Sequence, residues 1–132
     1  MKIVVIDGQG GKMGRAIIEE IKKQQGLAAE IIAVGTNSTA TATMLLAKAD
    51  AGATGENALI VNCRDADYII GPIGIIVADA LHGEISPAMS VAIGQSKAKK
   101  ILLPVSKCNT LVLGVKDMPL GEMVTLICKQ II

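Results

Sequence analysis

The 132-residue sequence has almost no aromatic residues: it contains no tryptophan and no phenylalanine, and Tyr68 is its one tyrosine. It therefore lacks the stacking surfaces on which single-stranded nucleic-acid binders rely. It also lacks a charge excess, because 13 basic residues stand against 12 acidic ones. No net field then attracts nucleic acid or an anionic membrane. We expect no nucleic-acid partner, and a core built from aliphatic side chains.

Long apolar runs and paired cysteines are missing as well. No apolar run approaches the roughly 18 residues that span a bilayer. The first run, after Lys2, is short and passes into glycines, unlike a signal peptide. Cys63, Cys108 and Cys128 are widely spaced and form no C-x-x-C pair, which argues against a disulfide framework or a zinc site. These absences predict a cytoplasmic protein with no membrane partner and no metal site. The length of 132 residues predicts one domain, residues 1–132.

Apolar runs alternate with helical patterns along the chain. Continuous apolar runs indicate buried parallel strands, and apolar residues that recur every three or four positions indicate helices. The predicted strands are 2–7, 29–35, 67–72, 99–105 and 110–115. The predicted helices run from Gly11 to about Gly26, over 41–49 to near Gly52, from Ser86-Pro87 to about Gly94, and over 120–132. Segments 56–63 and 73–81 are compatible with a helix or a strand.

Strands that alternate with helices indicate an α/β protein. We predict a single three-layer, doubly wound Rossmann-like domain with about five mostly parallel strands in the order 3-2-1-4-5. Ligands of such sheets bind beyond the carboxyl ends of the strands. The segments expected to meet there are 7–11, 35–38, 71–74, 106–109 and 116–117.

Four glycines fall within seven residues directly after the first predicted strand. They fit the dinucleotide fingerprint G-x-G-x-x-G: Gly8 allows a tight turn, Gly10 a close pyrophosphate, and Gly14 close helix packing. The start of the next helix offers unpaired N–H groups to an anion. We therefore predict a nucleotide or dinucleotide, NAD or NADP, as cofactor. The predicted binding residues of the turn are Gly8, Gln9, Gly10, Gly11, Lys12, Met13 and Gly14.

Alternatives to a dinucleotide site can be considered for the glycine turn. A P-loop is excluded, because Met13 stands where its Ser or Thr would bind magnesium. A tight turn with no ligand, or a site for another small anion, remains an alternative. The second strand ends without the carboxylate that usually binds ribose, and Asp7 would repel a pyrophosphate. The hydroxyl and amide groups that stand there suit a 2′-phosphate better, and they extend the predicted site by Thr36, Asn37 and Ser38.

A second glycine-containing loop follows the strand predicted at 67–72. There the backbone can run close to a ligand, so the predicted site includes Gly71, Pro72, Ile73 and Gly74, although a plain turn explains them equally well. The one histidine, His82, precedes Glu84 by two residues and is a candidate acid or base. Lys107 and Cys108 follow the fourth predicted strand, but no base is evident beside the thiol.

These observations leave the activity open. A sensor or binding module for a small-molecule nucleotide or other anionic ligand agrees with the sequence as well as a complete enzyme does. The alternative is a small oxidoreductase or transferase whose active site is completed across a homo-oligomer interface. Segments 73–81 and 123–132 are more apolar than one covered face requires, which favours such an oligomer. A structural partner protein with an empty cleft is the third possibility.

Two resemblances add to this interpretation. Gly8, Gly11, Lys12, Met13 and Gly14 match the G-x-x-G-[RK]-M-G turn of dihydrodipicolinate reductase, which implies nucleotide binding but, without that enzyme's second domain, not its reaction. Over its full length the chain resembles a family of short bacterial Rossmann-like proteins of unknown function. The shared blocks are VIDGQGG (5–11), AVGTNSTAT (33–41), GATGENA (52–58), IIGPIGI (69–75) and LGVKD (113–117).

Overall fold

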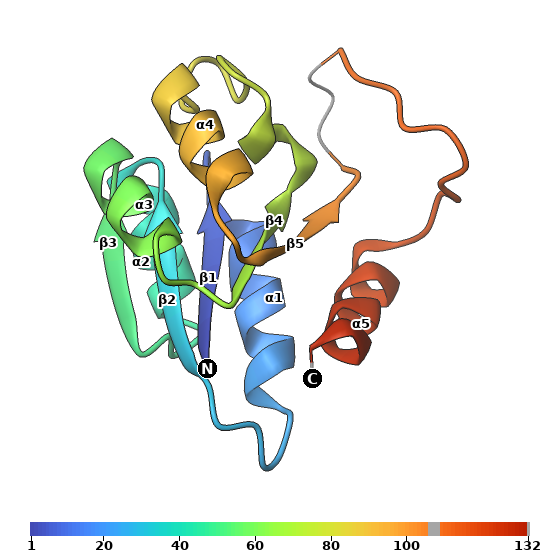
Figure 1. Cartoon of the computed structure of the whole chain (residues 1–132). Coiled ribbons are helices and arrows are strands. Elements are labelled where there is room, and N and C mark those ends of the chain that lie inside the picture. The colour runs from blue at the N-terminus through green and yellow to red at the C-terminus, as the bar shows by residue number, and fades with distance from the viewer. Residues whose placement is uncertain (106–108, 132) are drawn as a thin grey trace.

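The computed structural model describes residues 1–105 and 109–131, in which strands and helices alternate along the chain (Figure 1). The strands are β1 (Lys2–Asp7), β2 (Glu30–Gly35), β3 (Ala51–Thr54), β4 (Tyr68–Pro72) and β5 (Lys99–Leu103). The helices are α1 (Lys12–Lys22), α2 (Ser38–Leu45), α3 (Glu56–Cys63), α4 (Pro87–Gln95) and α5 (Leu120–Gln130). A short 3-10 helix, η1 (Ile73–Ile76), follows β4.

The strands form one parallel sheet in the order β3-β2-β1-β4-β5, so the predicted α/β class and strand order are confirmed. β1 pairs with β2 along its whole length and with β4 on its other side. The chain winds outward from β1 in both directions. The boundary between β1 and β4 is therefore the topological switch point, where ligands of such sheets bind.

Two strand assignments from the sequence need correction. The third strand is Ala51–Thr54, a short edge strand without a large apolar side chain, so no apolar run marks it. The run 67–72 is the fourth strand, and α2 ends at Leu45, not near Gly52. Residues 110–115 form no strand, because a turn at positions 113–114, with Gly114 at φ 80°, interrupts the extended chain. Of the two segments compatible with a helix or a strand, 56–63 forms the helix α3, and 73–81 forms η1 followed by turns.

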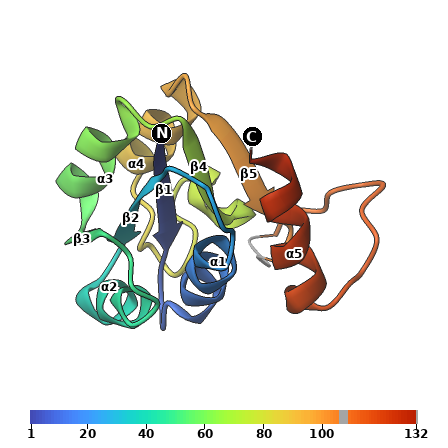
Figure 2. The same cartoon turned by 90° about the horizontal axis from the view of Figure 1, so that it is seen from below.

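Helices cover both faces of the sheet, as Figure 2 shows. Alternate residues of β1 point to opposite faces: Ile3 and Val5 pack with side chains of α1, α2 and α5, while Val4 and Ile6 pack with α3 and α4. All four side chains are fully buried. Burying an aliphatic side chain of this size contributes about 1.5–3 kcal/mol. The two apolar cores therefore account for the three layers and fix β1 at the centre.

None of the helices in residues 1–105 and 109–131 is long and apolar enough to cross a membrane. The longest, α1 and α5, have 11 residues each.

Candidate functional site

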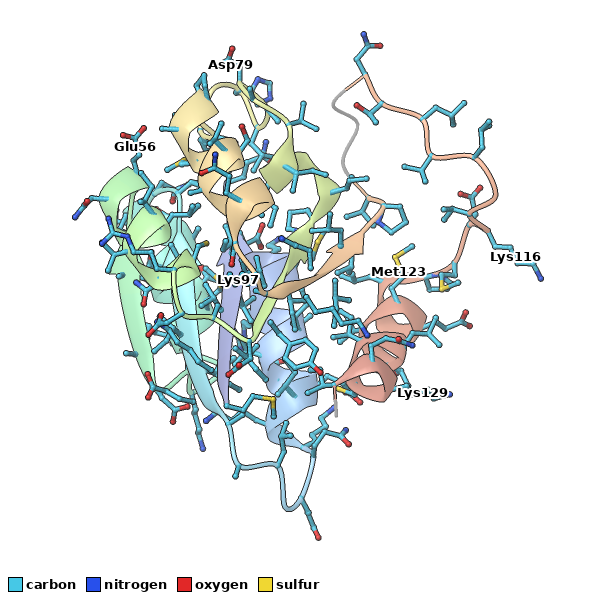
Figure 3. All side chains as sticks on the ribbon, viewed as in Figure 1. Glu56, Asp79, Lys97, Lys116, Met123 and Lys129 are labelled. Carbon is cyan, nitrogen blue, oxygen red and sulfur yellow. The ribbon has the colours of Figure 1, made fainter. Side chains whose placement is uncertain are left out.

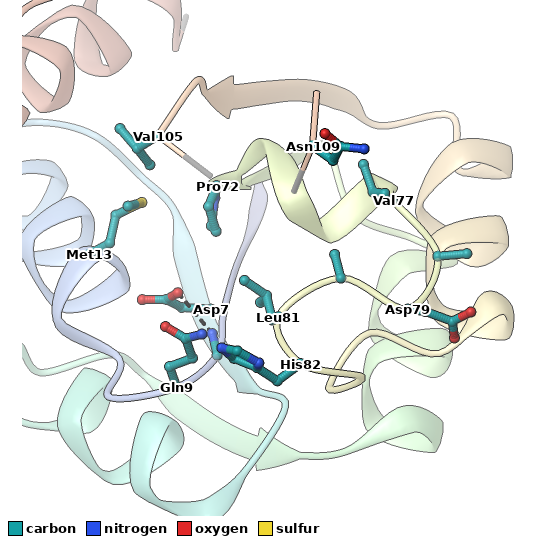
Figure 4. A pocket seen from close by; sticks show the side chains of 13 residues that line it. Asp7, Gln9, Met13, Pro72, Val77, Asp79, Leu81, His82, Val105 and Asn109 are labelled. Carbon is teal, nitrogen blue, oxygen red and sulfur yellow. Dashed lines mark hydrogen bonds between the residues drawn. The ribbon is translucent and has the colours of Figure 1, made fainter. Parts of the chain in front are cut away.

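A pocket of about 610 Å³ opens at the carboxyl ends of β1 and β4, at the switch point of the sheet (Figure 4). Its volume lies within the range of about 300–1,000 Å³ typical of small-molecule sites. Its polar lining comes from Asp7, Gln9, Asp79, His82 and Asn109. Its apolar lining comes from Met13, Pro72, Val77, Ala78, Ala80, Leu81 and Val105. The pocket therefore combines an aliphatic wall with a few polar groups.

Asp7 is the last residue of β1, and its carboxylate accepts hydrogen bonds from the glycine turn. Its Oδ1 accepts a hydrogen bond from the Gly8 N–H at 2.8 Å, and its Oδ2 accepts one from the Gly14 N–H at 2.7 Å. Gly14 lies in the first turn of α1, where the partial positive charge of a helix favours an anion. The chain's own carboxylate thus occupies the start of α1.

The environment of Asp7 also changes its acidity. Burial raises the pKa of this carboxyl, and the negative charge of Glu84 adds to the rise. The hydrogen bonds from Gly14 and Gly8 offset part of it. Asp7 consequently holds a proton at higher pH than an exposed aspartate does, and His82 lines the same pocket. The pocket thus places a carboxyl group of raised pKa and the one histidine of the sequence in the same lining.

Glu84 brings a second carboxylate to the turn, from the loop that follows η1. Its Oε1 accepts hydrogen bonds from the Gln9 N–H at 2.9 Å, the Thr36 hydroxyl at 2.6 Å and the Asn37 amide at 2.7 Å. Burial acts to raise the pKa of Glu84, but these hydrogen bonds and the nearby His82 outweigh it and lower the pKa. Glu84 therefore ties its loop to the turn and to the end of β2.

The loop that carries Glu84 has an unusual backbone. Asp79, Leu81 and His82 have positive φ angles of 66°, 56° and 56°, a region that side chains other than glycine rarely adopt. The Asp79 N–H donates to the Ile85 carbonyl at 2.7 Å, which closes the loop on itself. This strained loop forms one wall of the pocket. Strain of this kind concentrates at functional sites.

The four glycines of the turn are required for different reasons. At three of them an added Cβ would collide with another part of the chain: Gly8 with Thr36, Gly11 with Ala40, and Gly14 with Met44. Around Gly10, in contrast, no atom lies within 4 Å of such a Cβ. Three glycines thus serve packing within the chain, and only Gly10 leaves the backbone open to a ligand.

The structure brings some of the predicted site residues together and separates others. Gly8, Gln9, Met13 and Pro72 line the pocket. The other predicted residues do not line it: Gly10, Gly11, Lys12, Gly14, Thr36, Asn37, Ser38, Gly71, Ile73 and Gly74. Lys107 and Cys108 lie outside the described residues.

Several of the predicted residues outside the pocket have structural roles. Asn37 caps α2, since its Oδ1 accepts the Ala40 N–H at 2.8 Å, while Thr36 donates to Glu84. Gly71 packs against the carbonyl of Ile6 in the neighbouring strand. At these positions the local pattern reflects turns and strand contacts of the fold itself.

Sequence reasoning missed the pocket wall at 77–81 and the contact of Glu84 with the turn. One signal was available: the end of β2 lacks the carboxylate that accompanies the dinucleotide fingerprint. Glu84 supplies a carboxylate at that place from a separate loop. Only the folded chain brings position 84 next to positions 36 and 37.

The parallel sheet and the pocket at its switch point define a Rossmann-like α/β protein with a small-molecule-sized site. A family model matches residues 2–132, and the chain belongs to this family, described as "Domain of unknown function (DUF3842)". The predicted membership in a family of unknown function is confirmed. No curated protein and no solved structure matches the chain. The likeness of the turn to dihydrodipicolinate reductase stays a prediction.

Proposed function

We propose that the chain binds a nucleoside-type small molecule, neutral or cationic, in the pocket at the ends of β1 and β4. The observation that carries the proposal is the pairing of the turn's N–H groups with Asp7 and Glu84. Gly8, Gln9 and Gly14 each donate to one of these two carboxylates. A ligand pyrophosphate would have to displace these contacts and approach two negative charges.

The charges around the pocket support a ligand without phosphate. Among the described residues that line it, Asp7 and Asp79 are acidic, His82 is the one basic residue, and none is a lysine or arginine. Phosphate sites usually recruit such cations. A neutral or positively charged ligand therefore matches this lining better than a polyphosphate does.

A free carboxylate oxygen supports the nucleoside assignment. All three hydrogen bonds to Glu84 end on Oε1, and Oε2 accepts none from the described residues. Glu84 stands beside the pocket and not in its lining, and its Oε1 contacts Thr36 directly after β2. Rossmann proteins bind ribose hydroxyls through an acidic side chain at this place. The aliphatic wall of the pocket supplies the apolar surface that a base ring needs.

Thermal unfolding with matched ligand pairs tests the proposal. Adenosine and nicotinamide riboside, a neutral and a cationic nucleoside, are compared with their monophosphates and with NAD and NADP. A ligand at 100 times its dissociation constant adds about 2.7 kcal/mol to the stability. We expect the nucleosides to raise the unfolding temperature more than any phosphate-bearing partner. We also expect 2′,3′-dideoxyadenosine to bind more weakly than adenosine, because it lacks the hydroxyls that would donate hydrogen bonds to Glu84.

A matched pair of variants locates the binding. Ala78→Gln narrows the pocket at an exposed lining position, whereas Ala88→Gln makes the same change on α4, outside the lining. We expect only Ala78→Gln to reduce the ligand-induced shift. If none of the ligands shifts the unfolding temperature, or if both variants behave alike, the pocket is not a nucleoside site.

NAD or NADP is the second candidate, and one observation favours it. The backbone at Gly10 is open, so a pyrophosphate could approach there if the loop of Glu84 moved aside. Larger shifts with NAD or NADP than with the nucleosides would select this candidate. A role as sensor or binding module, an oxidoreductase or transferase activity, and a cytoplasmic location all stay predictions.

A further inference from the structure

The segment 110–118, here called the arm, leaves the body of the molecule and returns to the start of α5 (Figure 1). Leu111 and Leu113 on the arm are 83% and 84% exposed, more than any other large apolar side chain of the described residues. Their neighbour Val112 and the later Val115 turn the other way and line a groove of the same chain. The arm thus has one apolar face that lines the groove, where Val112 and Val115 are 39% and 47% exposed, and a second apolar face that is more exposed still.

The groove has a volume of about 370 Å³ and lies between β5, the arm and α5. Most of its wall is apolar: Ile101, Leu103 and Pro104 come from β5 and the residue after it, and Met123, Leu126 and Ile127 come from α5. Lys116 of the arm and Gln130 of α5 are the polar lining residues. In Figure 3, Met123 marks its α5 side and Lys116 the distant part of the arm. The groove is large enough, and apolar enough, to receive further aliphatic side chains.

The groove adjoins the outer edge of the sheet. Among the described residues, β5 is an edge strand that pairs only with β4. Lys99 and Lys100 occupy its amino end, and lysines on an edge strand oppose pairing with another chain. Its carboxyl half, from Ile101 to Leu103, carries no such charge. Pairing is therefore open only at the half of β5 that also lines the groove.

We propose that a second copy of this chain covers the groove, and that two copies exchange arms. Leu111 and Leu113 of each copy enter the groove of the other, and the stretch 111–113 extends along the carboxyl half of β5. Within one chain Val112 and Val115 of the arm line the groove, while Leu111 and Leu113 do not line it and stay exposed. The arm and the groove adjoin each other on one chain, so a twofold axis satisfies both contacts at once.

The amino-acid pattern of the arm supports this occupant. Residues 111–113, Leu-Val-Leu, have a strand-forming sequence, yet they form no strand within the described part of their own chain. An exposed strand edge and a strand-forming segment outside any sheet are complementary in hydrogen bonding as well as in apolar surface. A second copy supplies both elements in equal number.

Sedimentation velocity from micromolar to millimolar concentration tests the exchange. We expect the wild-type chain to form dimers. Leu111→Asp with Leu113→Asp should weaken dimerisation at least about tenfold, and so should Leu126→Asp in the groove. The matched control, Leu46→Asp with Val91→Asp, places the same charges on exposed apolar residues directly after α2 and on α4, and should leave the dimer intact. Circular dichroism verifies that each variant is folded.

Mixing the two defective chains distinguishes arm-in-groove exchange from arms that merely pack on each other. The chain with the altered groove has an intact arm, and the chain with altered leucines has an intact groove. Their mixture therefore restores one of the two contacts, and we expect heterodimers at concentrations where each variant alone is monomeric. A monomeric wild type, a dimer that survives the arm substitutions, or a mixture without heterodimers each overturns the proposal.

Discussion

The glycine turn after β1 and the arm before α5 both carry strong sequence patterns, but the chain completes them differently. In the turn, Asp7 and Glu84 accept the N–H groups that the dinucleotide fingerprint would offer to a phosphate. In the arm, Leu111 and Leu113 carry a strand-like apolar pattern that the described part of their own chain leaves largely exposed. The N–H groups of the turn thus have acceptors within the molecule, whereas the leucines of the arm remain exposed to solvent.

This difference shows what a local pattern can establish. A pattern specifies which groups a segment offers, such as N–H donors or apolar side chains, but not which partner takes them. Buried donors must find an acceptor, because an unsatisfied one costs about 1–3 kcal/mol. An exposed leucine has no comparable penalty, so an arm can stay uncovered in one chain. The turn is therefore tested by substitutions that break its contacts within the chain. The arm is tested by measuring whether a second copy of the chain binds to it.

Within the turn, the largest effect is expected from Gly11→Ala. Gly11 has a φ of 76°, and its added Cβ would lie 2.6 Å from the carbonyl oxygen of Ala40, a backbone atom that cannot move aside easily. The strained backbone and the collision together should lower the free energy of unfolding by about 3 kcal/mol. Urea denaturation of the purified variant measures this loss.

Gly10→Ala is the matched control, one residue away in the same turn. No atom lies within 4 Å of its Cβ, so the free energy of unfolding should change by less than about 0.5 kcal/mol. Equal losses at Gly10 and Gly11 would mean that the turn is not packed as described. A stable Gly10→Ala chain also allows ligand binding at the open backbone to be measured separately.

The sequence predicts the fold well because the sheet is built from continuous aliphatic runs. Runs such as 2–7 and 67–72 are buried on both faces, and this burial leaves a clear pattern. β3 was missed because an edge strand of Ala, Gly and Thr has no such pattern. The site was harder to predict, since Glu84 reaches Thr36 across 48 positions of sequence. No local periodicity encodes a contact of that kind.

A smaller and pH-dependent effect is expected from Glu84→Gln. The folded chain lowers the pKa of Glu84, so this carboxylate stabilises the fold at pH above its unfolded pKa of about 4.3. The stabilisation disappears as the pH falls through the lower pKa of the folded state. At neutral pH the variant should lose about 1 kcal/mol through its weaker, uncharged hydrogen bonds. The loss should shrink in acid, and denaturation at several pH values measures it.

Glu30→Gln provides the comparison for that series. Glu30 is exposed at the start of β2, so its substitution should leave the free energy of unfolding nearly unchanged at every pH. If Glu84→Gln showed the same flat profile as Glu30→Gln, the carboxylate would not tie its loop to the turn. Other contacts would then have to hold the loop that forms this wall of the pocket.

The smallest effect is expected at the arm, from Leu111→Ser with Leu113→Ser. In a dilute, monomeric sample both side chains face solvent, so the free energy of unfolding should change by less than about 0.5 kcal/mol. Ile127→Ala, at a buried position of α5, should cost about 2–5 kcal/mol under the same conditions. At high concentration the comparison sharpens, because dimerisation stabilises only a chain that can exchange arms. Wild-type stability should then rise with concentration while that of the double variant stays constant, and a large loss in the dilute sample would show that the leucines pack within their own chain.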